Sequence, residues 1–365
     1  MKTNASHHFP LLELARFCAA FSVVIYHVKH FYLTGVSGVT SSQLAYQSLA
    51  FSNVFGPLYT YGFLAVPVFW AISGFIIAYK YQGSCKSVSL RTFIFLRLSR
   101  LYPLVFLSLI VTACVQYIYY AETGSFFLNK VNDLDQFIAH ILLISGWSTA
   151  WRESFNHPVW SVSVEVISYL IFYLWIRFVR NDLIGLFQLL GLAILARVLF
   201  GANSIVLCLI LFFCGSIIYN FHCILASRLR AAAGMASCIV ASLGFAWLSV
   251  SEGRANTLGV IAIGCGVVGA CVFLESDLMR RFQPYVTALG NLTYSSYLIH
   301  FPLQIMMSIA VFWSFGGTEP LASQTSVLIY IVVTFLLAHV SFTYFERPMQ
   351  AVVRWRLLGV YPTIA

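Results

Sequence analysis

In one apolar segment near the start of the chain, residues 10–32, the ionisable side chains Glu13, Arg16, His27 and His30 form one stripe, and Lys29 points away from it. If this segment is an α-helix, Arg16 and His27 lie within about 20° of the same face and about 16 Å apart along the axis. Glu13 and His30 flank that face. Because ionisable groups inside a membrane-spanning helix are costly, this stripe predicts a polar functional site. For His27 alone, the alternative is an interfacial position at a helix end.

Two arginines precede another apolar run, in the segment Arg97-Leu-Ser-Arg100-Leu-Tyr-Pro103. Residues at i and i+3 share a helical face, so the two guanidinium groups can hold one phosphate through charge-assisted hydrogen bonds. Two alternatives remain open. The arginines could be ordinary positive charge at the cytoplasmic membrane boundary, or they could bind anionic lipid headgroups.

A carboxylate lies about a turn and a half inside another apolar helix, in the segment Trp160-Ser-Val-Ser-Val-Glu165. An unpaired Glu165 carboxylate would be costly at that depth, so we expect it to be protonated, paired or facing water. A histidine at similar depth on another helix is the partner we expect, because a carboxylate that orients an imidazole suits general base catalysis. The alternative is a structural glutamate bonded to a neighbouring helix.

The remaining polar motifs are weaker. His300 and Pro302 could mark a kinked polar site, but we favour packing for His300. Glu346 and Arg347 are interpreted as a charge pair at the membrane interface. The nine cysteines lie in or beside apolar runs without metal-ligand spacing, so we interpret them as packing residues and expect no metal site.

The composition requires a membrane protein. Of the 365 residues, 60% are hydrophobic and 9% are charged, against about 25% charged in ordinary soluble domains. Too few charged side chains are present to cover a soluble surface, which excludes soluble, disordered, disulfide-scaffold and nucleic-acid-binding classes. The net charge of +9 is attributed to Lys and Arg in cytoplasmic loops.

Apolar runs of the length needed to cross a bilayer predict about ten transmembrane helices and an all-α fold. The runs are 10–32, 60–80, 101–121, 159–178, 183–200, 203–221, 232–250, 256–274, 291–315 and 323–345. Residues 137–147 are too few to cross and are interpreted as a re-entrant or interfacial segment. The first run contains charges and lacks a small-residue cleavage site, so we expect no cleavable signal peptide.

The distribution of basic residues sets the expected orientation. With ten spans and a cytoplasmic N-terminus, fifteen of the 21 lysines and arginines fall on the cytoplasmic side and four outside. Both termini are therefore expected in the cytoplasm, and the larger outer loops are 33–58 and 122–158. We expect one membrane-embedded domain over residues 1–365 and no fused soluble domain, because the loops are too short to hold a catalytic module.

Taken together, these motifs resemble the membrane-bound acyltransferase family 3, whose members O-acylate carbohydrates and other small acceptors. The resemblance covers essentially the whole chain, with the motifs in the family's order. Its parts are Leu12–His27, Phe69–Phe75 (F-x-x-x-S-G-F), Arg97–Pro103 (R-x-x-R-x-Y-P), Trp160–Glu165 (W-S-x-x-x-E), Tyr297–Pro302 (Y-L-x-H-x-P) and Phe345–Pro348 (E-[KR]-P). Two places depart from the pattern, Glu13-Leu-Ala and Val166-Ile167, and they leave the substrate preference open.

The resemblance implies acyl transfer from cytoplasmic acyl-CoA, with acetyl-CoA the expected donor, to a hydroxyl of a carbohydrate or lipid-linked glycan outside. His27 would be the catalytic base or acyl relay, and Arg16, Arg97 and Arg100 would contact acyl-CoA. Glu165 is the expected support for His27, on the argument from depth given above. Further residues expected to shape the substrate site are Glu13, His30, Ser73, Trp160, Ser163 and His300. No bound cofactor is expected, and the expected location is a bacterial inner membrane.

Two other classes remain as alternatives. One is a transporter or flippase whose charged stripe lines a permeation path, and the other is a lipid-binding or scaffolding protein without chemistry. A ten-span transporter often shows an internal repeat, and none is visible in the sequence. The sequence leaves open the acceptor, the acyl chain and the route of the acyl group across the membrane.

Overall fold

The computed structural model describes residues 9–33, 48–84, 87–128, 131–201, 203–250, 256–276, 279 and 281–359. Within these ranges every regular element is a helix. Nine helical stretches in the described part are long and apolar enough to cross a membrane: Pro10–Leu33, Ser52–Gln82, Leu90–Thr123, Val159–Phe178, Leu183–Phe200, Ser204–Ile224, Ser227–Val250, Gln283–Phe315 and Gln324–Leu357. Another apolar helix, Thr257–Phe273, has 17 residues and coincides with the eighth predicted run. The all-helical membrane fold is therefore confirmed.

The chain forms two compact units. One comprises residues 1–19, 64–87 and 171–291, and the other comprises residues 20–63, 88–170 and 292–365. We call them the first and the second unit.

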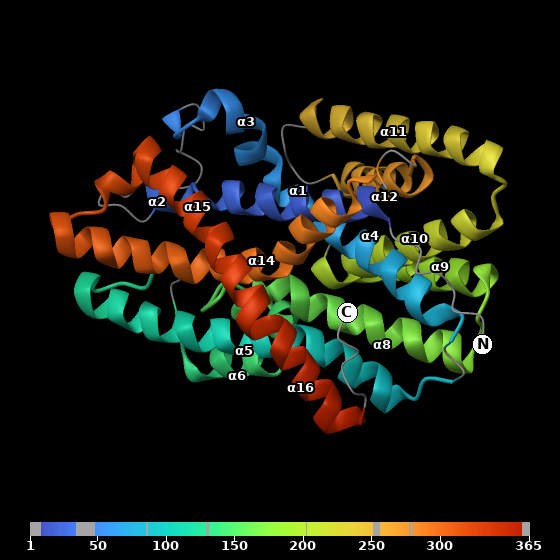
Figure 1. The fold of residues 1–365 in the computed structure, drawn as a ribbon, viewed down its shortest axis with the longest axis horizontal. Coiled ribbons are helices and arrows are strands. Elements are labelled where there is room, and N and C mark those ends of the chain that lie inside the picture. The colour runs from blue at the N-terminus through green and yellow to red at the C-terminus, as the bar shows by residue number, and fades with distance from the viewer. Residues whose placement is uncertain are drawn as a thin grey trace. The chain divides into compact units, whose positions relative to one another are not determined.

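In the first unit, helices pack through very small residues. Its main helices are α4 (Ala65–Ile77), α9 (Leu183–Phe200), α10 (Ser204–Ile224), α11 (Ser227–Val250) and α12 (Thr257–Phe273), with α11 and α12 side by side (Figure 1). A Cβ on Gly74 would overlap the Phe212 carbonyl, and one on Gly215 would overlap the Ala71 carbonyl. The backbones of α4 and α10 therefore touch, as small residues allow in membrane proteins.

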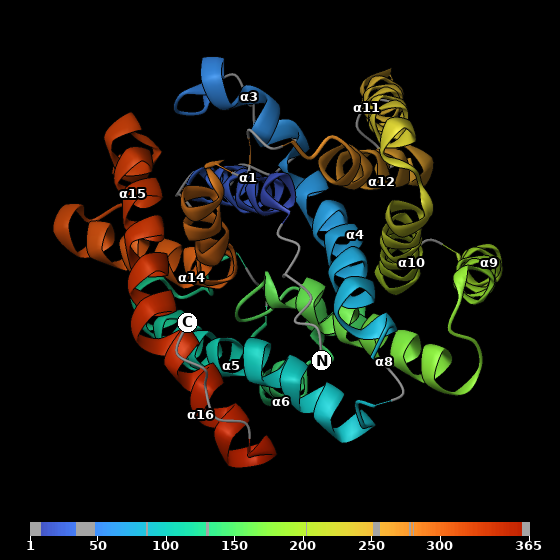
Figure 2. The ribbon, with the colours of Figure 1, turned by 45° about the vertical axis from the view of Figure 1, so that its right-hand side comes forward.

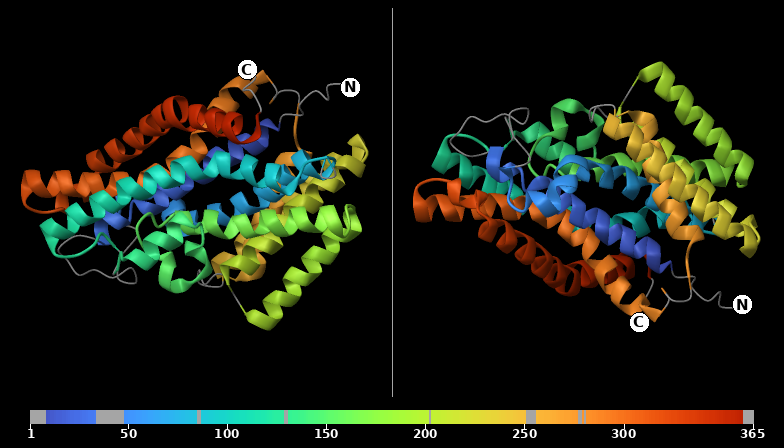
Figure 3. Two further views of the ribbon diagram at one scale, coloured as in Figure 1. Left: turned by 90° about the horizontal axis from the view of Figure 1, so that it is seen from below. Right: turned by 90° about the horizontal axis from the view of Figure 1, so that it is seen from above.

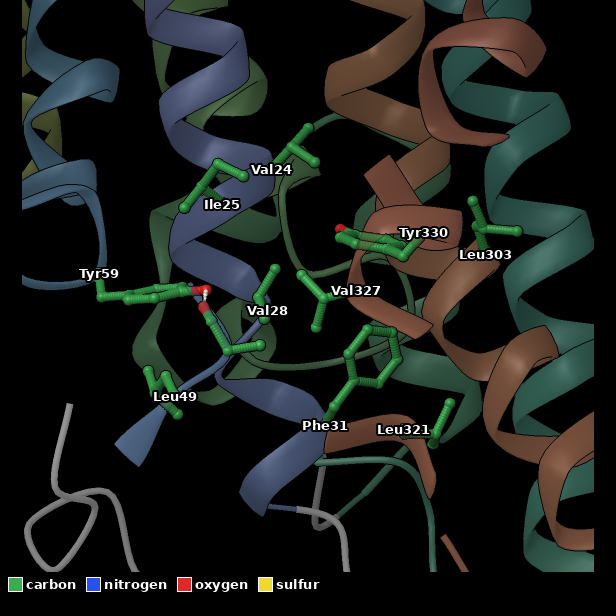
Figure 4. Packing of buried hydrophobic residues seen from close by; sticks show 11 residues of the cluster. Val24, Ile25, Val28, Phe31, Leu49, Tyr59, Leu303, Leu321, Val327 and Tyr330 are labelled. Carbon is green, nitrogen blue, oxygen red and sulfur yellow. Dashed lines mark hydrogen bonds between the residues drawn. The ribbon is translucent and has the colours of Figure 1, made fainter. Parts of the chain in front are cut away.

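The second unit contains the end of α1 (Pro10–His27), α2 (His30–Leu33), α3 (Ser52–Tyr61), α5 (Leu90–Thr123), the start of α8 (Val159–Phe178), most of α14 (Gln283–Phe315), α15 (Gln324–Ser341) and α16 (Arg347–Leu358). Figure 4 shows part of its apolar core, in which Val28 and Phe31 face Val327 and Tyr330 of α15. The Tyr59 hydroxyl donates to the Ala50 carbonyl at 2.6 Å, which satisfies the polar end of that side chain within the core.

The last span bends in the middle. A π-helical turn, Phe342–Glu346, joins α15 to α16, and such turns are a recognised cause of kinks. Figure 3 shows the red ribbon changing direction at this point. The bend lays α16 against α5 (Figure 2), so that the C-terminal helix meets the segment that carries Arg97 and Arg100.

The connection between α5 and α8 consists of short elements. They are α6 (Leu134–Ile141), a 3₁₀ turn (Ser145–Trp147) and α7 (Thr149–Arg152). Helix α6 has 8 residues, which at 1.5 Å per residue gives about 12 Å, too short to cross a bilayer. Residues 137–147 therefore form no span. Of the other predicted outer loop, 33–58, residues 34–47 lie outside the described part of the chain.

Candidate active site

Three histidine rings from three helices gather in the second unit. The ring centre of His27 (α1) lies 4.8 Å from that of His30 (α2) and 4.9 Å from that of His300 (α14). His157, in the connection before α8, lies within electrostatic range of all three rings. We call these four residues the histidine cluster. No pattern in the sequence pointed to His157. For His300 the sequence favoured packing, and it did not indicate the contact of that ring with His27.

Two of these rings use the same nitrogen, Nδ1, for a hydrogen bond to the backbone. His27 Nδ1 lies 2.8 Å from the Val23 carbonyl oxygen, and His300 Nδ1 lies 3.1 Å from the Ser296 carbonyl oxygen. A carbonyl oxygen only accepts hydrogen bonds, so in each neutral ring Nδ1 carries the hydrogen. The other nitrogen, Nε2, then holds a lone pair that can take a proton or attack carbon.

Gln304 of α14 joins two members of the cluster. Its amide nitrogen donates to the His27 carbonyl at 2.7 Å, and its amide oxygen lies 3.1 Å from His30 Nδ1. The first bond fixes the orientation of the amide, so the second requires a hydrogen on His30 Nδ1. The predicted helix through residue 31 is interrupted here, and Gln304 satisfies the His27 carbonyl at the end of α1. Its position four residues after His300 is the one signal in the sequence that points to it.

Replacing Gln304 by Leu tests this junction. We expect the variant to lose about 1–3 kcal/mol of stability, because it leaves the His27 carbonyl and the His30 ring without their buried partner. Thermal unfolding of the purified protein in detergent measures the change. Gln350→Leu, at a side chain that hydrogen-bonds Glu346 instead, is the matched control and leaves the histidine cluster intact. Equal melting temperatures for Gln304→Leu and the wild type would contradict the assigned role.

Pro302 explains how the connection before α8 reaches the cluster. Proline has no N–H, so the carbonyl one turn earlier, that of Leu298, loses its partner within α14. The Asn156 amide donates to this carbonyl at 3.0 Å. Asn156 precedes His157, so this bond fixes the neighbouring histidine beside the cluster.

His157 itself is held neutral. Burial, followed by the nearby Arg152, His140 and His300, lowers the pKa of His157 to about 4. The Arg152 guanidinium lies 3.6 Å above the ring of Trp160, a cation–π contact at the start of α8. Arg152 thus places a positive charge beside the histidine cluster, and this charge opposes protonation of His157.

The Trp160–Glu165 motif mainly organises the start of α8. Ser163 accepts from the Gly146 amide at 2.7 Å and donates to the Trp160 carbonyl at 2.7 Å. Glu165 accepts a hydrogen bond from the Tyr169 hydroxyl, one turn further along its own helix. The hydrogen bonds found for His27 and His30 involve Val23 and Gln304. Tyr169 is thus one hydrogen-bond partner of Glu165, and the expected support of His27 by Glu165 stays a prediction.

A third arginine joins the pair on α5. Arg354 of α16 donates through Nε to the hydroxyl of Ser99, which lies between Arg97 and Arg100, at 3.3 Å. The bend at residues 342–346 makes this contact possible, since it lays α16 on α5. Beside them, the Tyr294 hydroxyl donates to the Leu101 carbonyl at 2.6 Å. From the sequence, Arg354 counts only among the fifteen basic residues expected on the cytoplasmic side.

Glu346, predicted to form a charge pair at the membrane interface, is buried within the second unit. Its side chain is buried, accepting hydrogen bonds from the Ser295 hydroxyl at 2.7 Å and from the Gln350 amide at 3.2 Å. The hydrogen bonds explain how a carboxyl group is tolerated there. The E-[KR]-P segment therefore connects α14 to α16.

The remaining predicted site residues belong to the first unit. Arg16 and Glu13 form an ion pair of 2.7 Å, so the charge of this arginine is balanced by a residue one turn earlier. Gly290 leaves room for the Glu13 carboxylate, since a Cβ there would meet it. Ser73 lies in α4, next to the close contact of Gly74 with α10.

Comparison with known families decides the class of protein. The family model Acyl_transf_3, described as an acyltransferase domain, matches residues 9–343. The chain belongs to this acyltransferase family. Acyltransferase MdmB of Streptomyces mycarofaciens is 31% identical over 124 residues, which are 33% of this chain and 30% of that protein. The match thus spans less than a third of the curated relative, and no solved structure matches.

Membership in the acyltransferase family favours an enzyme over the transporter and scaffold alternatives. Acyl transfer to a weak nucleophile requires a base for its proton and a way to stabilise the developing negative charge. The histidine cluster offers lone pairs for the first task. The arginines of α5 and α16 offer donors for an anionic group of the substrate.

Proposed function

We propose that this acyltransferase moves an acyl group from acyl-CoA to a hydroxyl of a carbohydrate or lipid-linked glycan. Acetyl-CoA is the expected donor, and the expected location is the inner membrane of a bacterium. The observation that carries the proposal is the oriented His27 ring, whose Nδ1 is bound to Val23 and whose Nε2 is left to take a proton. A sugar hydroxyl is a weak nucleophile, and a base that takes its proton makes it reactive enough to attack the acyl carbon.

In this proposal the donor's phosphates bind Arg97, Arg100 and Arg354, and the acceptor hydroxyl binds at the histidine cluster. Arg16, paired with Glu13, is the further cation proposed to contact acyl-CoA. Glu165 is proposed to support the cluster as a carboxylate. Trp160, Ser163 and Ser73 are proposed to shape the substrate site.

Label transfer from [¹⁴C]acetyl-CoA tests the proposed reaction. The purified protein in proteoliposomes is given labelled acetyl-CoA and the total glycan and glycolipid fraction of the source cells' envelope. We expect label to appear in an alkali-labile ester on that fraction, because O-acyl esters are cleaved by mild base. Label that stays in acetyl-CoA, in every fraction and with every protein concentration, would overturn the proposal.

The two sides of the membrane are tested by cysteine labelling. With both termini cytoplasmic, Asn256→Cys reacts with an impermeant thiol reagent added to intact cells, and Arg281→Cys does not. The background is a variant without native cysteines that retains label transfer. Labelling at position 281 and protection at position 256 would invert the proposed orientation, and with it the assignment of acceptor and donor to the two faces.

A further inference from the structure

Lys29 carries a positive charge beside the proposed base. It lies in the two-residue break between α1 and α2, so the regular helix that would turn its side chain away from His27 ends before it. Its Nζ atom lies 3.3 Å from the centre of the Tyr26 ring, and that ring centre lies 5.3 Å from the ring centre of His27. Tyr26 therefore contacts both side chains and holds the ammonium group next to the base.

No carboxylate among the described residues pairs with this ammonium group. The two ion pairs found among them both lie in the first unit. The contact of Lys29 Nζ is the Tyr26 ring, which covers one side of an ammonium ion that has three N–H donors. A cation in a membrane-spanning segment is costly without an anion, so its retention there favours a functional role.

The ammonium group and the proposed base are accessible together. The side chains of Lys29 and His27 are both partly exposed, whereas His30 and His300 are buried. A ligand that reaches the His27 ring can therefore also reach Lys29. The two side chains offer it different chemistry, since His27 Nε2 accepts a hydrogen bond and Lys29 Nζ donates one with a full positive charge.

A second cation adds to the positive potential at the histidine cluster. His157 lies within electrostatic range of both Lys29 and Arg152. The carboxylate of Glu153 lies within range of Arg152 and offsets part of its charge. Two cations thus border the cluster, and Lys29 is the one that no described carboxylate balances. This arrangement favours a ligand that brings its own negative charge.

We propose that Lys29 binds an anionic group of the acceptor, a carboxylate or a phosphate, and thereby selects acidic glycans as substrates. This inference rests on the proposed function and deepens it, because it names the class of acceptor. The reacting hydroxyl binds His27 while the anionic group binds the ammonium group beside Tyr26. Both groups therefore belong to one sugar residue or to adjacent ones. Lys29 acts on acceptor binding and takes no part in proton transfer.

The charge of the labelled acceptor is the first test. The envelope glycans of the source cells are separated by anion exchange into an acidic and a neutral fraction, and each is given to the protein with [¹⁴C]acetyl-CoA. We expect the label in the acidic fraction. Two treatments of that fraction distinguish the anions: reduction of carboxyl groups, and cleavage of phosphate esters with hydrofluoric acid. Equal transfer to the neutral fraction would overturn the inference, and so would full transfer after each treatment.

Variants of Lys29 are the second test. Lys29→Met removes the charge and keeps an unbranched side chain that can pack on Tyr26. We expect its KM for the acidic fraction to rise about tenfold or more, because one charge-assisted contact is lost. Lys29→Arg keeps the charge and is expected to retain most of the affinity. Lys80→Met, at an exposed lysine of the first unit, is the matched control and keeps the wild-type KM. An unchanged KM in Lys29→Met would contradict the assignment.

Failure of the inference and failure of the proposed function give different results. If the wild type transfers no label to either fraction, the proposed function fails, and binding alone decides the inference. We then expect the acidic fraction to raise the melting temperature of the wild type in detergent, but not that of Lys29→Met. Equal stabilisation of both proteins would overturn the inference. Stabilisation by detergent-solubilised phosphatidylglycerol in place of the glycan, lost in Lys29→Met, would also overturn it and assign Lys29 to a lipid headgroup.

Discussion

His27→Ala is expected to reduce acyl transfer by at least about 100-fold, the lower range for loss of a positioned general base. The Nε2 lone pair of His27 is the group that takes the hydroxyl proton, and neither water nor alanine supplies a base at that position. Initial rates of label transfer from [¹⁴C]acetyl-CoA, at matched amounts of membrane-inserted protein, measure the loss.

Two further variants make the His27 prediction specific. His27→Gln is expected to be equally inactive, because an amide keeps a hydrogen bond but cannot take a proton. His339→Ala, at an exposed position of α15, is the matched histidine control and retains wild-type rates. Activity retained in His27→Ala would remove this histidine from the mechanism, whatever the contribution of its neighbours.

The membrane-spanning helices were predictable because a hydropathy profile shows the length of each apolar run directly. All ten runs coincide with helices of the structure, since about 20 apolar residues are what a bilayer core requires. The break after His27 was not predictable in this way. It depends on Gln304, 277 residues away, whose amide replaces the missing bond at the end of α1. A hydropathy profile carries no information on such a partner.

The candidate site was predictable residue by residue but not pair by pair. Depth along a helix placed Glu165 and His27 at similar levels, yet depth does not give the direction in which a side chain points. The tyrosine that Glu165 contacts is four residues further along the same helix, a spacing that the sequence does show. The contact of His27 with His300 joins α1 to α14 and required the tertiary structure.

The grouping of Arg97 and Arg100 with Arg354 also required the tertiary structure. The i, i+3 pair on α5 was visible as a motif, but Arg354 enters only because a π-helical turn bends the last span onto α5. Arg354 donates to Ser99, which lies between Arg97 and Arg100 in the sequence of α5, so two helices contribute arginines to this segment. An anion held by both helices would be lost in part when any one arginine is removed.

Arg97→Ala, Arg100→Ala and Arg354→Ala are each expected to raise the KM for acetyl-CoA with a smaller change in kcat. Loss of one charge-assisted contact costs about 1.5–3 kcal/mol, which corresponds to roughly a 10- to 150-fold rise. Replacement by lysine is expected to restore only part of the affinity, because a point charge cannot reproduce the planar fork of a guanidinium group. Initial rates as a function of acetyl-CoA concentration give KM and kcat separately.

Arg180→Ala is the matched control for the loss of one positive charge. Arg180 is exposed and forms its ion pair with Asp182, in the first unit, at 2.7 Å. An exposed pair of this kind contributes little, so the KM for acetyl-CoA is expected to stay at the wild-type value. The comparison also separates donor binding from membrane topology, since both kinds of variant remove one arginine.

Unchanged KM in correctly inserted Arg97→Ala and Arg100→Ala would return these arginines to the role of positive charge at the membrane boundary. Unchanged KM in Arg354→Ala alone would restrict the phosphate contacts to α5 and leave α16 a packing element.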